Sequence, residues 1–280
     1  MNSLLEPLQY VFMREALVVG AVGAALGAVL SCFLILKGWS LMGDAVSHAV
    51  LPGIVLAYAA GLPLAVGAFA AGLGCALASG WIKAHSRLKE DTVLGVVFTG
   101  LFALGLVLFS RVPGDLHLDH ILFGNILGVT RAQVWQISGI GFGVLAIVLA
   151  RRRDLLLVCF DEKHARVLAL PAGFLHYLLL SLLALVIVVS LQAVGLLLVV
   201  AMLITPGATA RLWTDSFDRM LAAAVGTAVF SSTAGIFVSY HIAGSTAACI
   251  VLFQTVLFVI SLVVSRWRGG RVYRSVFPGR

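Results

Sequence analysis

The chain has 280 residues, of which 61% are hydrophobic and only 11% are charged, and its mean hydropathy is +1.09. Because an ordinary soluble domain has about 25% charged residues, this composition excludes a soluble enzyme, a nucleic-acid-binding protein and a disordered chain. The formal net charge of +7 is therefore interpreted as charge that sets membrane topology, and no nucleic-acid partner is expected.

Apolar stretches without charge recur along the whole chain, and crossing a bilayer core takes about 20 helical residues. The stretches cover 16–36, 42–59, 64–82, 93–110, 134–150, 175–191, 195–210, 220–238 and 246–265. Two of them are short enough to be broken or re-entrant. We therefore predict an all-α polytopic membrane protein with eight to nine transmembrane helices in a single domain over 14–265. Residues 1–13 alternate apolar and polar groups and lack the basic start of a signal peptide, which predicts an interfacial amphipathic segment.

The basic residues orient the chain. The segments predicted to be cytoplasmic are 37–41, 83–91, 151–171, 211–219 and 266–280. Together they contain every lysine and arginine except Arg14, Arg111 and Arg131, as the positive-inside rule requires. The C-terminus is therefore predicted to be cytoplasmic, with 266–280 as a basic, solvated tail that contacts anionic membrane lipid.

One of the apolar stretches, 42–59, is an exception because it contains a carboxylate together with a histidine. Asp44 and His48 are four residues apart, so on a helix they share one face. Ionisable groups inside a membrane usually line a pathway or bind a partner, and a carboxylate with an imidazole but no thiolate suits Mn, Fe or Zn. Ser47, on the adjoining face, and Pro52, which can kink the helix, are predicted to support the channel lining. The alternative is structural, with Asp44 paired to a lysine such as Lys37 and His48 bonded to a carbonyl group.

A second polar cluster, His117, Asp119 and His120, lies in the predicted outer loop. Its spacing could hold a metal ion, as a vestibule to the channel. The alternative is a solvated polar loop.

A cytoplasmic segment is predicted to form a short amphipathic helix over 161–170. Asp161 is a suitable N-cap, and Pro171 ends the helix. The apolar residues Ala165, Leu168 and Ala169 fall at i, i+3 and i+4 and would share one face. Such a helix can lie in a groove of a soluble partner; the alternative is an ordinary interfacial connector.

Several motifs of enzymes are missing from the sequence. It contains no GxxxxGK[ST] loop for nucleotide phosphates and no HExxH motif of a zinc protease. Ser47 and His48 are neighbours on a helix, so their side chains diverge by about 100°, which disfavours an intramembrane hydrolase. The four cysteines are far apart and form no CxxC pair, which predicts small core residues. The chain is not expected to be an enzyme or to bind a permanent cofactor.

Five segments, in order, resemble the permease subunits of bacterial ABC importers for manganese, zinc and iron (the ABC-3 type). LKGWSLMGDAVSHAVLPG (36–53) resembles the family signature, and FDEKHARVLALP (160–171) is similar to the family's coupling segment. The other segments are EDTVLGVVF (90–98), ILFGNILG (121–128) and SLQAVGLLLVVAMLITPGATARL (190–212). The likeness covers roughly residues 10–265. GDxxSHAVLPG is similar to the manganese and iron branch, whereas zinc permeases tend to have GDxxAHxA, and the family usually has a glycine where this chain has Ala169.

The resemblance implies a transport function. Asp44 and His48 would contribute to the cation site of the translocation channel, and 161–170 would dock on the ATPase. The implied partners are cytoplasmic ABC ATPase subunits, a second permease chain (as homodimer or paralogous heterodimer) and an extracytoplasmic metal-binding protein, assembled at the bacterial cytoplasmic (inner) membrane. The transported ion would be Mn²⁺ or Fe²⁺, with Zn²⁺ as an alternative. A further alternative is an ion-coupled secondary transporter acting alone, although the sequence shows no clear internal repeat.

Overall fold

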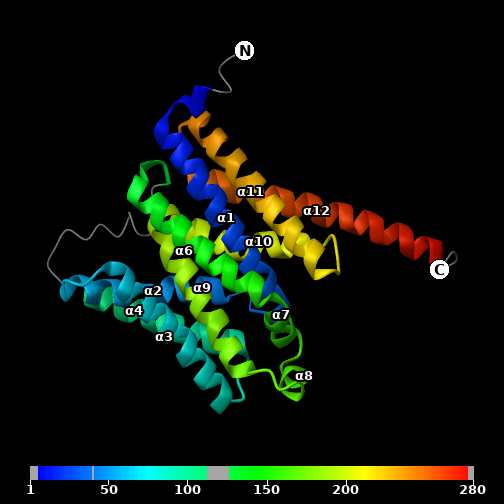
Figure 1. Ribbon diagram of the computed structural model, residues 1–280, viewed down its shortest axis with the longest axis horizontal. Coiled ribbons are helices and arrows are strands. Elements are labelled where there is room, and N and C mark those ends of the chain that lie inside the picture. Colours follow the sequence, from blue (N-terminus) through cyan, green and yellow to red (C-terminus); the bar gives the residue numbers. More distant parts are fainter. Residues whose placement is uncertain (1–5, 40, 112–125, 277–280) are drawn as a thin grey trace.

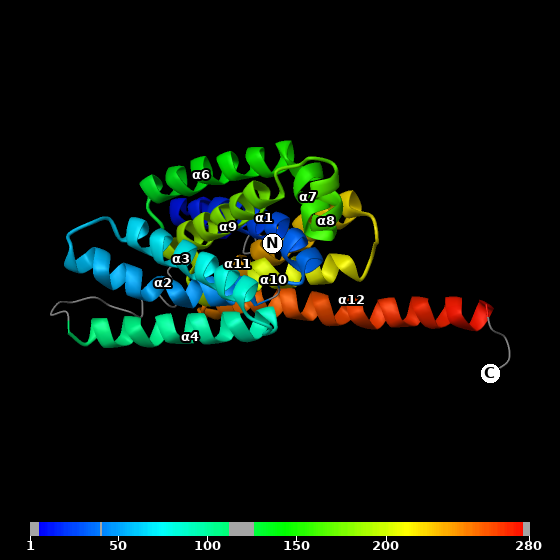
Figure 2. The same ribbon diagram turned by 90° about the horizontal axis from the view of Figure 1, so that it is seen from below.

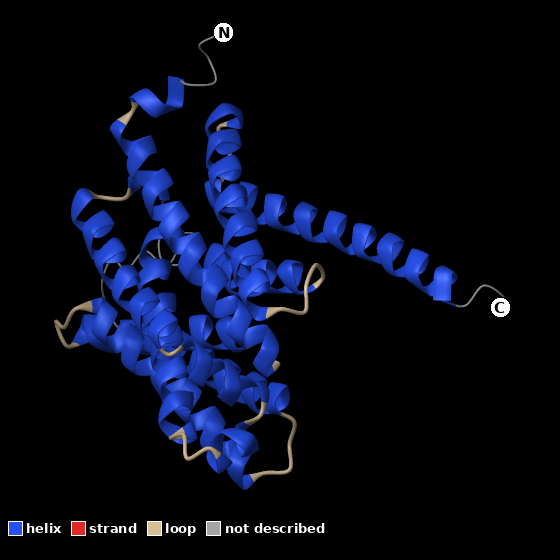
Figure 3. Cartoon of the chain, turned by 45° about the vertical axis from the view of Figure 1, so that its right-hand side comes forward, coloured by secondary structure: helices blue, strands red, loops and turns tan. Residues whose placement is uncertain are grey.

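The computed structural model describes residues 6–39, 41–111 and 126–276, and over these parts the chain is helical with no strand (Figure 3). The long helices are α1 (Val11–Lys37), α2 (Met42–Ala59), α3 (Leu64–His85), α4 (Glu90–Phe109), α6 (Arg131–Ala150), α9 (Ala172–Val194), α10 (Leu196–Arg211), α11 (Phe217–Ile242) and α12 (Thr246–Val276). The short helices are η1 (Glu6–Gln9), η2 (Ile126–Gly128), α7 (Arg152–Phe160) and α8 (Glu162–Val167).

The transmembrane helices lie where hydropathy predicts them. Eight helices in the described part are long and apolar enough to cross a membrane, and α10 is a shorter apolar helix of 16 residues. This confirms the predicted all-helical membrane fold. The predicted boundary at residue 13 differs, because α1 already begins at Val11 and buries Met13, after the short helix η1. At the other end, α12 stays helical to Val276, through most of the predicted tail 266–280.

The helices divide into an inner and an outer set. The apolar windows of α1 and α2 are each 72% buried and that of α9 is 67% buried, against 28% for α3, 17% for α4 and 22% for α6. Seen from below, α4 forms the outermost layer beneath α2 and α3, and α12 projects away from the bundle (Figure 2). Since lipid is as apolar as the side chains it contacts, packing between these helices depends on close fit.

Small residues provide that fit at two crossings. The backbones of α2 and α3 touch at Gly53 and Gly67, where a Cβ added to either glycine would overlap the carbonyl oxygen of the other. At the α1–α10 crossing, the Ser31 hydroxyl donates to the Ile204 carbonyl oxygen (3.1 Å) and accepts from the Gly207 N–H (3.0 Å). The inner helices are thereby held at backbone contact.

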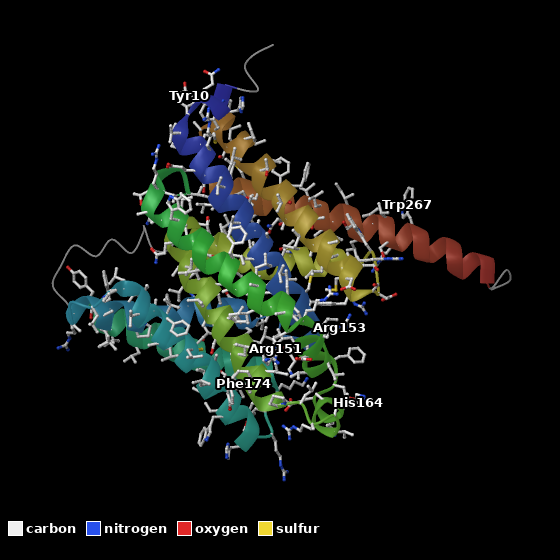
Figure 4. All side chains as sticks on the ribbon, viewed as in Figure 1. Tyr10, Arg151, Arg153, His164, Phe174 and Trp267 are labelled. Atoms are coloured by element: carbon white, nitrogen blue, oxygen red, sulfur yellow. The ribbon has the colours of Figure 1, made fainter. Side chains whose placement is uncertain are left out.

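Polar contacts gather three of the predicted cytoplasmic segments, 37–41, 151–171 and 211–219, at one end of the bundle. Lys37, at the end of α1, lies 3.7 Å from Glu162 of α8, and Arg152 of α7 lies 3.0 Å from Asp218 of α11. Arg151, Arg153 and His164 lie at this end and Tyr10 at the opposite one (Figure 4). The common end of these segments agrees with the charge pattern, while the side of the membrane on which they lie stays a prediction.

Candidate functional site

Asp44 and His48 lie together on the first two turns of α2. The Asp44 Oδ1 and His48 Nε2 atoms are 3.4 Å apart, and the two side chains are 34% and 28% exposed. All their helical neighbours from Ala45 to Ser47 are buried. The pair is therefore the polar, accessible strip of an otherwise packed transmembrane helix.

The separation of the two atoms suits a shared metal ion. With ligand distances of about 2.1 Å, two adjacent ligand atoms of one divalent ion lie roughly 3.0–3.5 Å apart. The observed 3.4 Å lies within this interval. A cation could therefore bind to both side chains without a change in backbone conformation.

Aromatic rings of α4 fix the orientation of the imidazole. The His48 ring stacks on Phe98 at 5.9 Å between ring centroids and meets Phe102 edge to face at 5.3 Å. On the opposite side, Gly43 packs against Leu203 of α10, whose Cδ1 would lie 3.1 Å from an added Cβ. The surrounding helices thus hold the pair in one geometry, which lowers the entropic cost of binding a cation.

Ser47 and Pro52 do not lie on this polar strip. The Ser47 side chain is buried and its hydroxyl donates to the Gly43 carbonyl oxygen at 2.7 Å. Pro52 is also buried, and α2 continues through it to Ala59. These two residues pack the helix within this chain, and their support of a channel lining stays a prediction. The commitment of the Ser47 hydroxyl to its own helix also argues against a hydrolase nucleophile.

Lys37 does not pair with Asp44. Its ammonium group donates to the Val158 carbonyl oxygen at 3.2 Å and approaches Glu162 at 3.7 Å, and it lies 5.5 Å from the centre of the Trp39 ring. The structural alternative for Asp44, an ion pair with Lys37, is therefore wrong.

The described residues supply at most part of a coordination shell. Within them, no group of three or more His, Cys, Asp and Glu side chains could hold a metal ion. His117, Asp119 and His120, the predicted vestibule residues, lie outside the described residues. The described part of the chain therefore brings two candidate ligands together, Asp44 and His48.

The predicted coupling helix begins as expected. Asp161 is the N-cap of α8, and its carboxylate accepts a hydrogen bond from the His164 backbone N–H at 3.0 Å, which lowers the pKa of Asp161. Arg166, and secondarily Lys37, lower the pKa of Glu162, so this carboxylate is ionised at neutral pH and bridges the two cations. The helix is thereby tied to the end of α1.

The helix ends earlier than predicted, which changes its apolar face. It stops at Val167, and Ala169 follows with a left-handed φ of 56°. Ala165 is fully buried within this chain, whereas Val167 is 82% and Leu168 56% exposed. The predicted common face of Ala165, Leu168 and Ala169 is therefore wrong, because only Ala165 lies within the helix.

Pro171 separates α8 from the next transmembrane helix. It is the residue before α9, where its fixed φ suits a helix start. Helix α8 was predicted to end at Pro171, but it ends before this proline, at the turn that contains Ala169.

Sequence reasoning missed two groups of contacts. The first is the ring contact of Phe98 and Phe102 with His48. The family resemblance drew attention to the segment 90–98, which includes Phe98, but did not predict this contact. The second is the link from Lys37 to Glu162, for which the sequence carries no local signal.

These features define a class of protein: a multi-pass helical membrane protein with a carboxylate–imidazole pair on one packed transmembrane helix and a short helix at one end of the bundle. Residues 9–265 match the family model described as ABC 3 transport family. The chain belongs to this family.

The similarity to individual relatives extends over nearly the whole chain. The chelated iron transport system membrane protein YfeD of Yersinia pestis is 55% identical over 258 residues, which are 92% of this chain and 87% of that protein. The manganese transport system membrane protein MntB of Synechocystis is 50% identical over 260 residues, 93% of this chain and 85% of the relative. The structure of PsaBC from Streptococcus pneumoniae in complex with Fab superimposes with a TM-score of 0.84 at 38% identity, covering 93% of this chain and 94% of that one.

Proposed function

We propose that this chain is the transmembrane permease subunit of an ATP-driven importer of divalent transition-metal ions, working by alternating access, with Mn²⁺ or Fe²⁺ as its cargo. The observation that carries the proposal is the 3.4 Å approach of the Asp44 and His48 ligand atoms on a membrane helix. The names of the relatives, which refer to chelated iron and to manganese, favour these ions over the zinc alternative.

The proposed transporter contains a second permease chain. Two ligands leave most of the coordination sphere of Mn²⁺ or Fe²⁺ open, and a second Asp–His pair facing the first would supply four protein ligands, with water in the rest. The Asp44 and His48 side chains are each about one-third exposed on the described chain, which leaves the pair open to contact with another chain. The second chain would be a further copy or a paralogue.

Energy would come from separate ATPase subunits. The sequence has no phosphate-binding loop of the GxxxxGK[ST] type, while the end of α8 presents exposed Val167 and Leu168 to a cytoplasmic partner. A metal-binding protein would deliver the ion from the extracytoplasmic side of the bacterial inner membrane. Membership of an ABC transport family argues against the alternative of a secondary transporter acting alone.

The test is metal uptake by cells that carry the complete transporter, with Mn²⁺, Fe²⁺ and Zn²⁺ in competition. We expect Asp44→Asn and His48→Leu each to lower uptake at limiting metal by roughly tenfold or more, since loss of an outer-shell partner alone costs about 10–100-fold in metal sites. Membrane abundance should stay at the wild-type level.

Two matched variants control for chemistry outside the site. Asp91→Asn and His85→Leu make the same changes at exposed positions of α4 and α3 and should leave uptake unchanged. Wild-type uptake in both site variants would contradict the assignment of the metal pair. Preferential uptake of Zn²⁺ would contradict the proposed cargo and leave the metal pair in place.

A further inference from the structure

A cavity of about 460 Å³ opens at the end of the bundle where the basic segments meet. It lies between α3, α4, α8, α9 and the turn from α1 to α2. Its lining includes Lys37, Trp39, Ser79, Lys83, Glu162 and Arg166. Sites for small ligands commonly have volumes of about 300–1,000 Å³, so the cavity is large enough for a small polar group with part of an apolar chain.

The lining has excess positive charge. Lys37, Lys83 and Arg166 contribute three cations, and Glu162 is the single carboxylate among the lining residues. Glu162 already contacts both Arg166 (2.6 Å) and Lys37 (3.7 Å). The Lys83 ammonium group donates to the backbone carbonyl of Leu88 (2.6 Å) and has no carboxylate partner in the lining. The net positive charge of the lining favours binding of an anion.

The cavity has a buried back wall and an open mouth. Lys37 is only 15% exposed and Arg166 69%, so the cations extend from the interior to the surface. The Ser79 hydroxyl is buried in the wall and has the Cys75 thiol as a side-chain partner. A ligand with several acceptor oxygens would contact the ammonium and guanidinium groups of the lining.

Exposed aromatic side chains lie on the helices that form the mouth. Trp81 of α3 and Phe174 and Tyr177 of α9 are more than half exposed, and Phe174 lies near the same end as His164 in Figure 4. Such residues mark the level of lipid headgroups. The cavity wall also contains Leu94 and Leu180, which can pack against an acyl chain.

We propose that this cavity binds a phosphate-bearing anion, supplied as the headgroup of an anionic phospholipid of the inner leaflet. The phosphate lies between Lys83 and Arg166, and its glycerol and acyl part extends past Leu94 and Leu180. Basic pockets between transmembrane helices suit such headgroups, and the cytoplasmic leaflet is rich in anionic lipid. The bound lipid links α3 to the short helix α8.

The experiment measures the melting temperature of the complete, purified transporter in detergent after addition of phosphatidylglycerol, phosphatidylcholine or inorganic phosphate. We expect phosphatidylglycerol to raise the melting temperature by about 4 °C and the zwitterionic lipid to have a much smaller effect. The same increase with inorganic phosphate alone would support the anion site with a soluble source. Equal effects of the two lipids would overturn the proposal.

Two kinds of variant test the location. Lys83→Gln with Arg166→Gln should weaken phosphatidylglycerol binding, measured by native mass spectrometry, by about tenfold or more, whereas Arg87→Gln removes a nearby exposed charge outside the lining and should not. Gly80→Leu fills the cavity without altering charge, because a Cβ at Gly80 meets no atom within 4 Å. Gly74→Leu is its match on α3, with equally open space outside the lining. Wild-type lipid binding in both the double variant and Gly80→Leu would overturn the proposal.

Discussion

The two functional regions of this protein are built in opposite ways. Around Asp44 and His48, α2 is packed on several sides, and its apolar window is 72% buried. The α7–α8 segment instead exposes Phe160, Val167 and Leu168, by 81%, 82% and 56%. The difference teaches that the candidate metal pair is positioned by the chain's own packing, whereas the α7–α8 segment leaves apolar surface that this chain does not cover.

The largest effect should come from breaking the packing of α2. Gly53→Leu would place a side chain where the α3 backbone touches α2 at Gly67. Overpacking of side chains costs about 1–3 kcal/mol, and we expect more than this because a backbone would have to move. Thermal unfolding of the purified protein should show the loss.

Gly100→Leu is the control for this change. It lies on exposed α4 with no atom within 4 Å of an added Cβ, and it should unfold at the wild-type temperature. A wild-type melting temperature for Gly53→Leu would show that α2 is not held by close contact with α3.

The next prediction separates the two sides of the coupling segment. Ala165→Asp would bury a carboxylate without a partner and should destabilise the chain by about 3 kcal/mol or unfold α8. Leu168→Asp lies on an exposed position and should change stability by less than about 0.5 kcal/mol, yet abolish co-purification with the ATPase. Should Leu168→Asp assemble normally, the exposed surface is not the docking site.

A smaller effect is expected from Lys37, which joins the two regions. Lys37→Met removes the donor to the Val158 carbonyl and one of the two cations beside Glu162, a loss of about 1–2 kcal/mol. Because α2 follows directly after this contact, ATP hydrolysis by the assembled transporter should continue while metal uptake falls. Lys37→Arg should retain part of the uptake. Parallel loss of hydrolysis and uptake would show that Lys37 does not connect α8 to the metal pair.

The smallest effect is a gain in stability. Ala169 has a φ of 56°, a conformation that costs a residue with a Cβ about 1 kcal/mol and costs glycine nothing comparable. Ala169→Gly should raise stability by about 0.5 kcal/mol, measured by thermal unfolding. Ala150→Gly, at the helical end of α6, should instead lower it by about 0.5–1 kcal/mol. A loss in both variants would mean that the turn after α8 is not strained.

The sequence predicts those features that depend on local chemistry. Apolar runs located every long helix, since a backbone in lipid must satisfy its own hydrogen bonds. Helical spacing brought Asp44 and His48 together, and the short polar side chain of Asp161 identified the start of α8. Each of these inferences needs only neighbours within one helical turn.

Features that depend on distant residues could not be predicted in this way. Lys37 donates to a backbone carbonyl 121 residues away. The sequence pointed only to the nearby Asp44 as its partner. The apolar periodicity after Ala165 predicted one face, but the left-handed turn at Ala169 ended the helix first. Alanine usually continues a helix, so the residue pattern alone predicts that the helix extends through Ala169. It cannot show that this alanine adopts the left-handed conformation usual for glycine, which ends the helix.

The four cysteines, all buried and without disulfides, give the chain a property of practical use. Burial raises the pKa of the Cys159 thiol to about 11, so at neutral pH almost none of it is the thiolate that reacts with maleimides. Burial of all four side chains should keep the native thiols from maleimides during site-directed labelling. Tyr10 and His164 are exposed and lie at opposite ends of the bundle (Figure 4), as do the start of α1 and the short helix α8 (Figure 1). Single cysteines at these two positions would report each face of the membrane separately without removal of any native thiol.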